Sequence, residues 1–212
     1  MTMTSIDSLY RKEDGRVLIE IKLSSVAQLF NTFDPAPFYA RELDREAARY
    51  IVDTVNDFPS NTEFRIVVYL PAEALGTKEA EKIPHAIVNH FRYMVLVQER
   101  EFRQRWSYGK YTLVIGLAFL AIAEIASRIV AETFPDSPVA QLGATALEVA
   151  GWVAMWEPVT VLLYQLWPII AQKKVYEKIS GMEIDLCPYP ESGMPVYGQG
   201  CLVFRQGTLS EK

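Results

Sequence analysis

The chain has 212 residues, of which 50% are hydrophobic and 22% charged, and its mean hydropathy is +0.06. This apolar fraction excludes a disordered tail, and two cysteines are too few for a disulfide scaffold. The formal net charge of −5 argues against nucleic acid as a partner, because phosphate binding requires clustered positive charge.

The N-terminal part of the chain predicts a small α+β domain. Residues 1–15 are polar and lack the apolar core of a signal peptide, so we expect no cleaved leader. Residues 16–23 and 63–70 alternate apolar and polar side chains, which predicts two half-buried strands. Apolar residues at helical spacing predict a helix over residues 43–58. We assign residues 16–108 to this domain, which we expect in the cytoplasm.

A long helix is predicted to lead from this domain into the most apolar part of the chain. Pro84 suits a first helical position, and an apolar stripe follows it up to Trp106. Residues 99–105 are highly charged, and Gly109 is the one obvious break after them. We expect this helix to continue almost without interruption into residues 111–131.

Two apolar blocks predict a two-helix transmembrane hairpin over residues 109–172. Residues 111–131 would form a helix of about 31 Å, close to the roughly 30 Å hydrocarbon thickness of a bilayer. The second block, residues 145–171, is longer than a span requires and contains Pro158, so we expect a tilt, a kink or an interfacial first turn. The alternative is a pair of buried helices in a soluble bundle, but neither block has the polar face of a surface helix.

The placement of charge predicts the orientation of this hairpin. The connection, residues 132–143, contains no Lys or Arg. The opposite ends of the two blocks are flanked by basic residues: Arg100, Arg103, Arg105, Lys110, Lys173, Lys174 and Lys178. The positive-inside rule therefore predicts a multi-pass membrane protein with both termini in the cytoplasm. Aromatic residues near the same boundary would form an interfacial belt: Trp106, Tyr108, Tyr111, Tyr164 and Trp167.

The cytoplasmic tail, residues 173–212, is expected to contribute one or two strands. Residues 182–186 alternate apolar and acidic side chains, and residues 201–204 form a second short apolar run. Because two strands alone make a poor sheet, we expect at least one tail strand to join the N-terminal pair. Cys187 and Cys201 would face a reducing cytoplasm, so we expect free thiols.

The sequence FDPAPF at residues 33–38, followed by RELD at residues 41–44, resembles a pattern of bacterial two-span inner-membrane proteins. That family has a small N-terminal cytoplasmic domain, a two-helix hairpin and a short tail. The resemblance implies an inner (plasma) membrane setting and brings no activity, cofactor or catalytic residue with it. From the residues themselves, Asp34 before Pro35 favours a turn and Leu43 begins the predicted helix. We therefore interpret the segment as a structural connection rather than a binding site.

The sequence carries no recognisable catalytic motif. It contains no GxGxxG after a strand, no P-loop and no GxSxG elbow, and its cysteines form no CxxC pair. His85 and His90 are five residues apart and lie off each other's helical face, which makes a poor metal site. We therefore expect no catalytic residue, no metal and no cofactor.

Three charged residues in the apolar blocks predict an intramembrane ion-pair cluster. Glu124 and Arg128 are four residues apart and share a helical face, so they can pair. If the two antiparallel blocks pair about their centres, Arg128 lies level with Ala150 and within a turn of Glu148. Such charges are costly to insert, about 2.5–3.5 kcal/mol for a central Arg or Asp. We favour a structural contact between the helices over a functional site for this cluster.

Glu157 has no basic residue at its predicted depth, near the middle of the second block. It stands between Trp156 and Pro158, and the proline leaves the carbonyl of Ala154 without its helical donor. A protonated Glu157 could donate a hydrogen bond locally or to another subunit, whereas an ionised one needs water, a cation or a partner chain. The position suits a proton or cation site or an oligomer contact, and both remain open.

Two spans with a short connection are too few to enclose a pore. We therefore expect a non-enzymatic protein of the lipid bilayer that forms a homo-oligomer or an accessory subunit of a larger membrane complex, with its cytoplasmic domain mediating interactions. The alternative is an oligomeric ion channel or proton-linked transporter that uses Glu157. An enzyme acting on membrane substrates ranks third.

Overall fold

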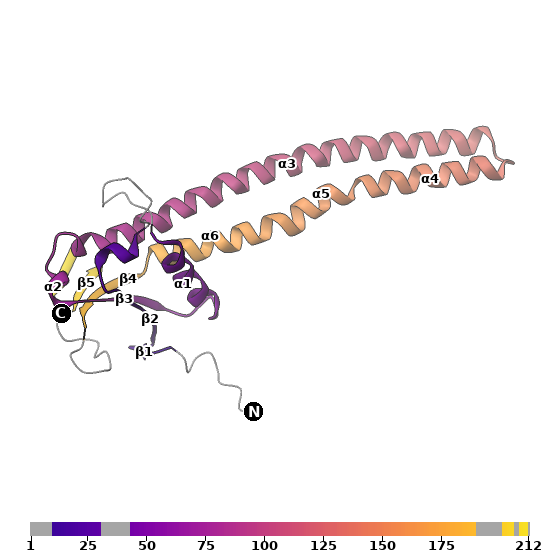
Figure 1. Ribbon diagram of the computed structural model, residues 1–212. Helices are drawn as coiled ribbons and strands as arrows, with labels where there is room; N and C mark the ends of the chain where they lie inside the picture. Colours follow the sequence, from indigo (N-terminus) through magenta and orange to yellow (C-terminus); the bar gives the residue numbers. More distant parts are fainter. Residues whose placement is uncertain (1–9, 31–42, 190–200, 206–207, 212) are drawn as a thin grey trace, which may run out of the picture. The chain divides into compact units, whose positions relative to one another are not determined.

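The computed structural model describes residues 10–30, 43–189, 201–205 and 208–211. The chain forms two compact units, one of Met1–Val95 with Lys174–Lys212 and the other of Leu96–Lys173. The first unit contains a β-sheet and the second a pair of long helical arms (Figure 1).

Within the described residues, six strands form one mixed sheet in the order β1-β2-β3-β4-β5-β6. The central strands are parallel to one another: β2 (Arg16–Lys22), β3 (Phe64–Leu70) and β4 (Glu183–Pro188). The outer strands are antiparallel to their neighbours: β1 (Lys12–Glu13), β5 (Leu202–Arg205) and β6 (Thr208–Glu211). The pairing of β4 with β3 confirms the expected tail strand, whereas β1 and β6 are not predicted from the sequence.

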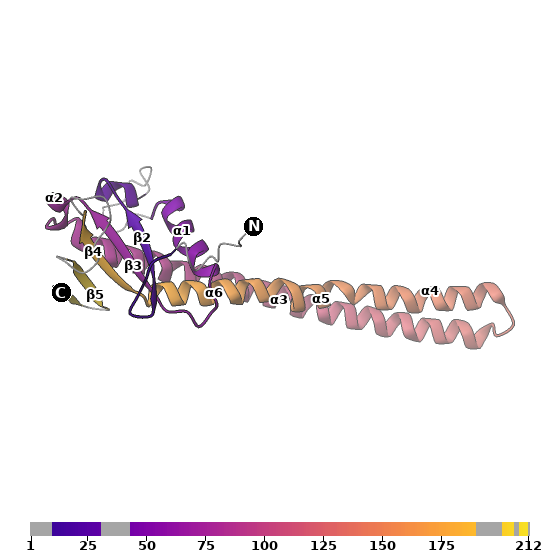
Figure 2. The ribbon, with the colours of Figure 1, turned by 90° about the horizontal axis from the view of Figure 1, so that it is seen from below.

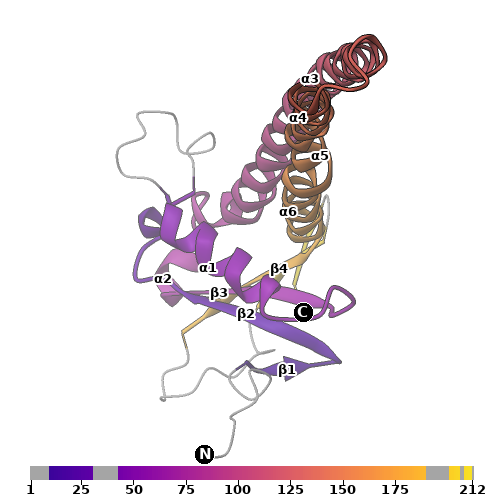
Figure 3. The ribbon, with the colours of Figure 1, turned by 90° about the vertical axis from the view of Figure 1, so that its right-hand side faces the viewer.

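One face of the sheet packs on helices. The core joins Ile66 of β3 to Ile51 of α1 (Arg45–Asn56) and Ile87 of α3 (Ile83–Thr133), and all three side chains are 0% exposed. Helix α1 lies along the strands on this side (Figure 3). Alternation along β2 and β3 therefore separates a helix-covered face from a second face.

Each parallel strand pair requires a crossover, and the two crossovers differ greatly in length. Helix α1 connects β2 to β3, and it begins where Asp44 accepts hydrogen bonds from the backbone N–H groups of Glu46 and Ala47 at 2.9 and 3.3 Å. The connection from β3 to β4 leaves through α3 and returns through α6 (Leu166–Ser180). Short helical turns complete the first unit: Val26–Leu29, α2 (Ala72–Leu75) and Ala80–Lys82.

The second unit is an antiparallel pair of arms (Figure 2). The first arm belongs to α3, which continues through Gly109 as one helix, as expected from the sequence. The second arm consists of α4 (Pro138–Ala154), α5 (Trp156–Thr160), a π-helical turn (Val161–Gln165) and the start of α6. The interruption at Met155 lies one turn before Pro158, whose nitrogen has no hydrogen to donate.

Cys187 and Cys201 form a disulfide, so the expectation of free thiols is wrong. Strand β5 pairs antiparallel with β4, with Leu202 opposite Leu186. This pairing brings the two cysteines together with their Cα atoms 4.3 Å apart. Both are 1% exposed and pack with Leu18, Val67 and Tyr69 on the second face of the sheet.

Candidate functional site

Among the residues that the structure describes, two helices are long and apolar enough to cross a membrane, Ala80–Thr133 and Pro138–Ser180. Their most apolar windows have mean hydropathies of 2.1 and 1.3, and only 11% and 17% of those windows are buried. The core helix of a soluble protein would be mostly buried. Large apolar side chains point outward along both arms, among them Ile115 (68% exposed) and Trp152 (65% exposed). Such a surface matches lipid or another apolar partner rather than water.

The two arms meet along a seam of small residues spaced seven apart. Six buried residues follow this spacing: Gly109, Gly116 and Ala123 on α3, and Ala144, Gly151 and Pro158 on the second arm. A seven-residue spacing keeps such a seam on one side of a helix. The backbones approach closely, because a Cβ on Gly116 would lie 3.3 Å from the carbonyl oxygen of Ala154. Within the described hairpin, these six buried positions hold no charged side chain.

The seam determines the register of the two arms. A Cβ on Gly151 would lie 3.4 Å from Leu120 Cα, so these two residues stand side by side. Counting along the antiparallel arms from this contact, Arg128 lies level with Gly143 rather than with Ala150. The expectation from centring the apolar blocks is therefore wrong, because close packing of small residues decides the register.

Arg128 forms an ion pair with Glu124 on the outer surface of the hairpin. Arg128 Nη2 lies 3.0 Å from Glu124 Oε1, and Arg128 Nε donates a hydrogen bond to the same oxygen at 3.0 Å. Their side chains are 74% and 40% exposed. Glu148 is exposed at the level of Ala123, and in the part of the chain that the structure describes no ion pair joins it to Arg128. The structure thus brings together two members of the predicted cluster, and the place of Glu148 in it stays a prediction.

Glu157 and Trp156 are exposed, whereas Pro158 is buried in the seam. A Cβ on Gly116 would lie 3.5 Å from Pro158 Cγ. This contact places Glu157 within about one helical turn of the level of Tyr111, where the first apolar block begins. Glu157 therefore lies nearer the basic end of the hairpin than its position within the second block suggested.

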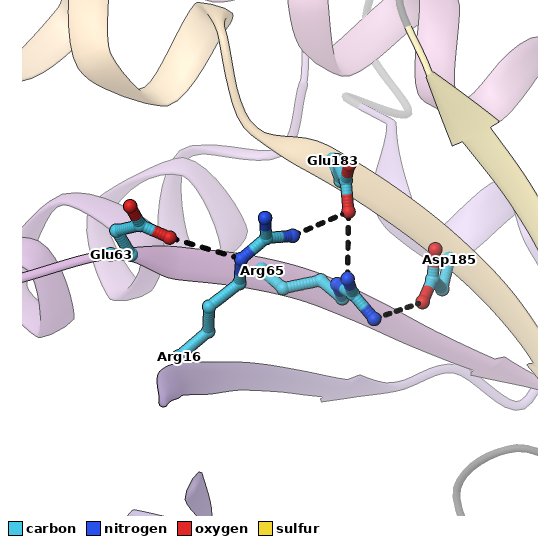
Figure 4. Close-up of polar contacts among 5 residues, drawn as sticks. All are labelled: Arg16, Glu63, Arg65, Glu183 and Asp185. Carbon is cyan, nitrogen blue, oxygen red and sulfur yellow. Dashed lines mark hydrogen bonds and ion pairs between the residues drawn. The ribbon is translucent and has the colours of Figure 1, made fainter. Parts of the chain in front are cut away.

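A charged network that the sequence did not reveal lies on the second face of the sheet (Figure 4). Arg65 Nη2 lies 2.7 Å from Glu183 Oε2, and Arg65 Nη1 lies 3.6 Å from Asp185 Oδ2. Arg16 reaches the same Glu183 oxygen at 2.7 Å and Glu63 at 3.1 Å. The side chains of Arg65 and Asp185 are 8% and 0% exposed. These ion pairs link β2, β3 and β4.

Because side chains alternate along a strand, Glu183 and Asp185 point to the same face of the sheet, and the pairing of β3 with β4 puts Arg65 on that face too. Their contact depends on the pairing of Arg65 with Glu183 across β3 and β4, which join segments far apart in the chain. The sequence therefore predicts this contact only when the pairing of β3 with β4 is already known.

Among the described residues, no group of three or more His, Cys, Asp or Glu side chains could hold a metal ion. His85 instead contacts the ring of Phe204, with ring centroids 4.6 Å apart. The resembling segment at residues 33–42 lies outside the described residues. Comparisons with protein-family models, with curated proteins and with solved structures find no match to this chain.

Proposed function

We propose that this chain is a non-enzymatic membrane-anchored subunit. Its hairpin spans the bilayer and assembles with further chains through its outer surface, while its α+β domain mediates interactions beside the membrane. The observation that carries this proposal is the placement of charge within the apolar segments. Arg128, Glu148 and Glu157 are exposed on the outside of the hairpin, and small residues fill the seam between its arms.

Charged side chains within a membrane usually face the interior of a helix bundle or a water-filled cavity, because each costs about 2.5–3.5 kcal/mol at the centre of a span. The seam already fills the interior of this hairpin. Further chains that complete such an interior would therefore lower the cost of these side chains. A homo-oligomer supplies it most simply, because each copy brings the cation Arg128 together with several carboxylates.

The flanking charges support an orientation with both termini in the cytoplasm of a bacterial inner membrane. The Cys187–Cys201 disulfide instead favours an extracytoplasmic location for the C-terminal segment, because disulfides persist in oxidising compartments. We give the flanking charges more weight, since both cysteines are 1% exposed and thus shielded from reductants. Reporters fused at Met1 and Lys212 test this orientation, and an extracytoplasmic signal from either end would contradict it.

Oligomeric state in mild detergent tests the assembly. We expect the wild-type protein to elute as an oligomer by size exclusion with light scattering, and to yield cross-linked species in its native membrane. Glu157→Gln should retain the oligomer because it keeps the shape and hydrogen bonding, whereas Glu157→Leu should loosen it. Glu132→Leu, at the exposed end of α3, is the matched control. A wild-type chain that is monomeric in several detergents and gives no cross-link would refute the proposal.

A second candidate function is an oligomeric ion channel or proton-linked transporter that uses Glu157. The π-helical turn at Val161–Gln165, directly after α5, favours it, because such turns are frequent at functional sites. Under this candidate, Glu157→Gln assembles normally but abolishes ion or proton flux in reconstituted vesicles. Wild-type oligomers without any flux would count against it and leave the assembly role intact.

A further inference from the structure

A groove of about 410 Å³ opens at the base of the hairpin. Its lining residues all belong to the second unit: Glu99, Phe102, Arg103, Ile169, Ile170 and Lys173. Three of the lining side chains are apolar and come from both arms, and the other three are charged. The groove is therefore amphipathic, like the lipids that would surround it.

The charged lining residues are two cations and one carboxylate. Lys173 Nζ lies 2.9 Å from Glu99 Oε1. The hydrogen bond and the charge of Lys173, with a smaller contribution from the charge of Arg103, lower the pKa of Glu99, so this carboxyl is ionised at neutral pH. Arg103 is exposed and leaves the groove with a net positive charge.

The groove lies about one helical turn from aromatic residues expected at the membrane boundary. Phe102 stacks on Trp106, with ring centroids 6.3 Å apart, and Trp167 is 76% exposed. Trp and Tyr side chains of this kind lie at the level of the lipid headgroups. Arg103 is one turn from Trp106, and long basic side chains extend toward the headgroup layer.

We propose that this groove binds an anionic phospholipid. The phosphate contacts Arg103 and Lys173, and an acyl chain follows Phe102, Ile169 and Ile170. An arginine fork suits phosphate geometry, and basic pockets between membrane helices bind anionic headgroups. This inference rests on the proposed function, because it requires the hairpin to lie in a bilayer.

Fluorescence quenching by brominated lipids tests the site in the full-length protein. Trp106 remains as the only tryptophan in a Trp152→Phe, Trp156→Phe, Trp167→Phe variant reconstituted in phosphatidylcholine vesicles. We expect brominated phosphatidylglycerol to quench Trp106 at a concentration about fivefold lower than brominated phosphatidylcholine. Arg103→Gln should remove this preference and Glu99→Gln should strengthen it. Arg100→Gln, the same charge change one turn away, should retain it.

The outcomes distinguish failure of the lipid-binding groove from failure of the hairpin to insert into the membrane. A second variant with Trp152 as its single tryptophan reports insertion, because any brominated lipid should quench it. Quenching of Trp152 without selectivity at Trp106 would overturn the lipid site and leave the membrane anchor standing. Loss of the preference on adding inorganic phosphate would also overturn it, because the groove would then bind a free anion. Absence of quenching at Trp152 would contradict the proposed function itself.

Discussion

Gly151 stands directly against Leu120 in the seam of the hairpin. A Cβ added to Gly151 would lie 3.0 Å from Leu120 Cδ1 and 3.4 Å from Leu120 Cα. Small residues allow such close backbone approach between membrane helices. This contact fixes which residues of the two arms lie level with one another.

Gly151→Leu should force the two arms apart. The new side chain would overlap Leu120 and Ala123, at a cost of about 1–3 kcal/mol in the free energy of unfolding. Thermal unfolding of the purified protein in detergent, followed by circular dichroism, measures this loss. Gly143→Leu is the matched control, because a Cβ at Gly143 meets nothing within 4 Å. Equal destabilisation by both substitutions would contradict the seam.

Arg128→Leu should weaken self-association by about 1–2 kcal/mol, because Glu124 loses its cation in an apolar setting. Adding Glu124→Gln and Glu148→Gln should recover part of this loss, since no unpaired carboxylate then remains. The dissociation constant of the oligomer is measured for each variant by fluorescence energy transfer in vesicles. Comparing these constants gives the interaction energy among the three residues. Simple additivity of the three substitutions would show that they form no network.

Asp185→Leu should lower the free energy of unfolding of the α+β unit by about 3 kcal/mol. The substitution removes one of the carboxylates that neutralise the charge of the buried Arg65 guanidinium. Glu63→Gln is the control, because its side chain is 72% exposed and such surface pairs contribute about 1 kcal/mol or less. Denaturant titration with hydrogen exchange at β3 and β4 separates this unit from the hairpin. A small effect at Asp185 would mean that the network is dispensable for stability.

The double variant Cys187→Ala, Cys201→Ala should lower stability by about 3 kcal/mol, because the disulfide closes a loop with a sequence separation of 14. Denaturation of the oxidised and reduced wild-type protein should reproduce this difference. Maleimide labelling of the denatured protein, prepared without reductant, provides the direct check. Stoichiometric labelling at both positions would show free thiols and argue for a reducing compartment.

The Glu99–Lys173 pair should make the stability of the hairpin near these two residues depend on pH. Because Lys173 lowers the pKa of Glu99, the pair's contribution is complete above the ordinary glutamate pKa and is lost as the pH falls through the lowered value. A carbon NMR titration of Glu99 measures this pKa directly. Lys173→Gln should raise it, whereas Lys174→Gln should leave it unchanged. An unaltered titration in Lys173→Gln would show that the pair does not form in solution.

Local patterns were sufficient to predict most elements of this protein. Alternation along residues 16–23 and 63–70 and helical spacing near Ile87 depend on neighbours within a few residues, so strands and helices follow from the sequence alone. The continuity of α3 through Gly109 and the apolar length of both arms were predictable for the same reason. The predicted Glu124–Arg128 contact also lies within one helix, four residues apart.

Contacts between distant segments required the tertiary structure. The close approach of Gly151 to Leu120 shifted the register of the arms, because backbone packing is decided by two helices together and not by the length of either. The Cys187–Cys201 bond and the Arg65–Asp185 ion pair likewise depend on which strands become neighbours. Hydrophobic periodicity specifies which face of a strand is buried, but strand pairing and side-chain geometry decide which charges and thiols meet there.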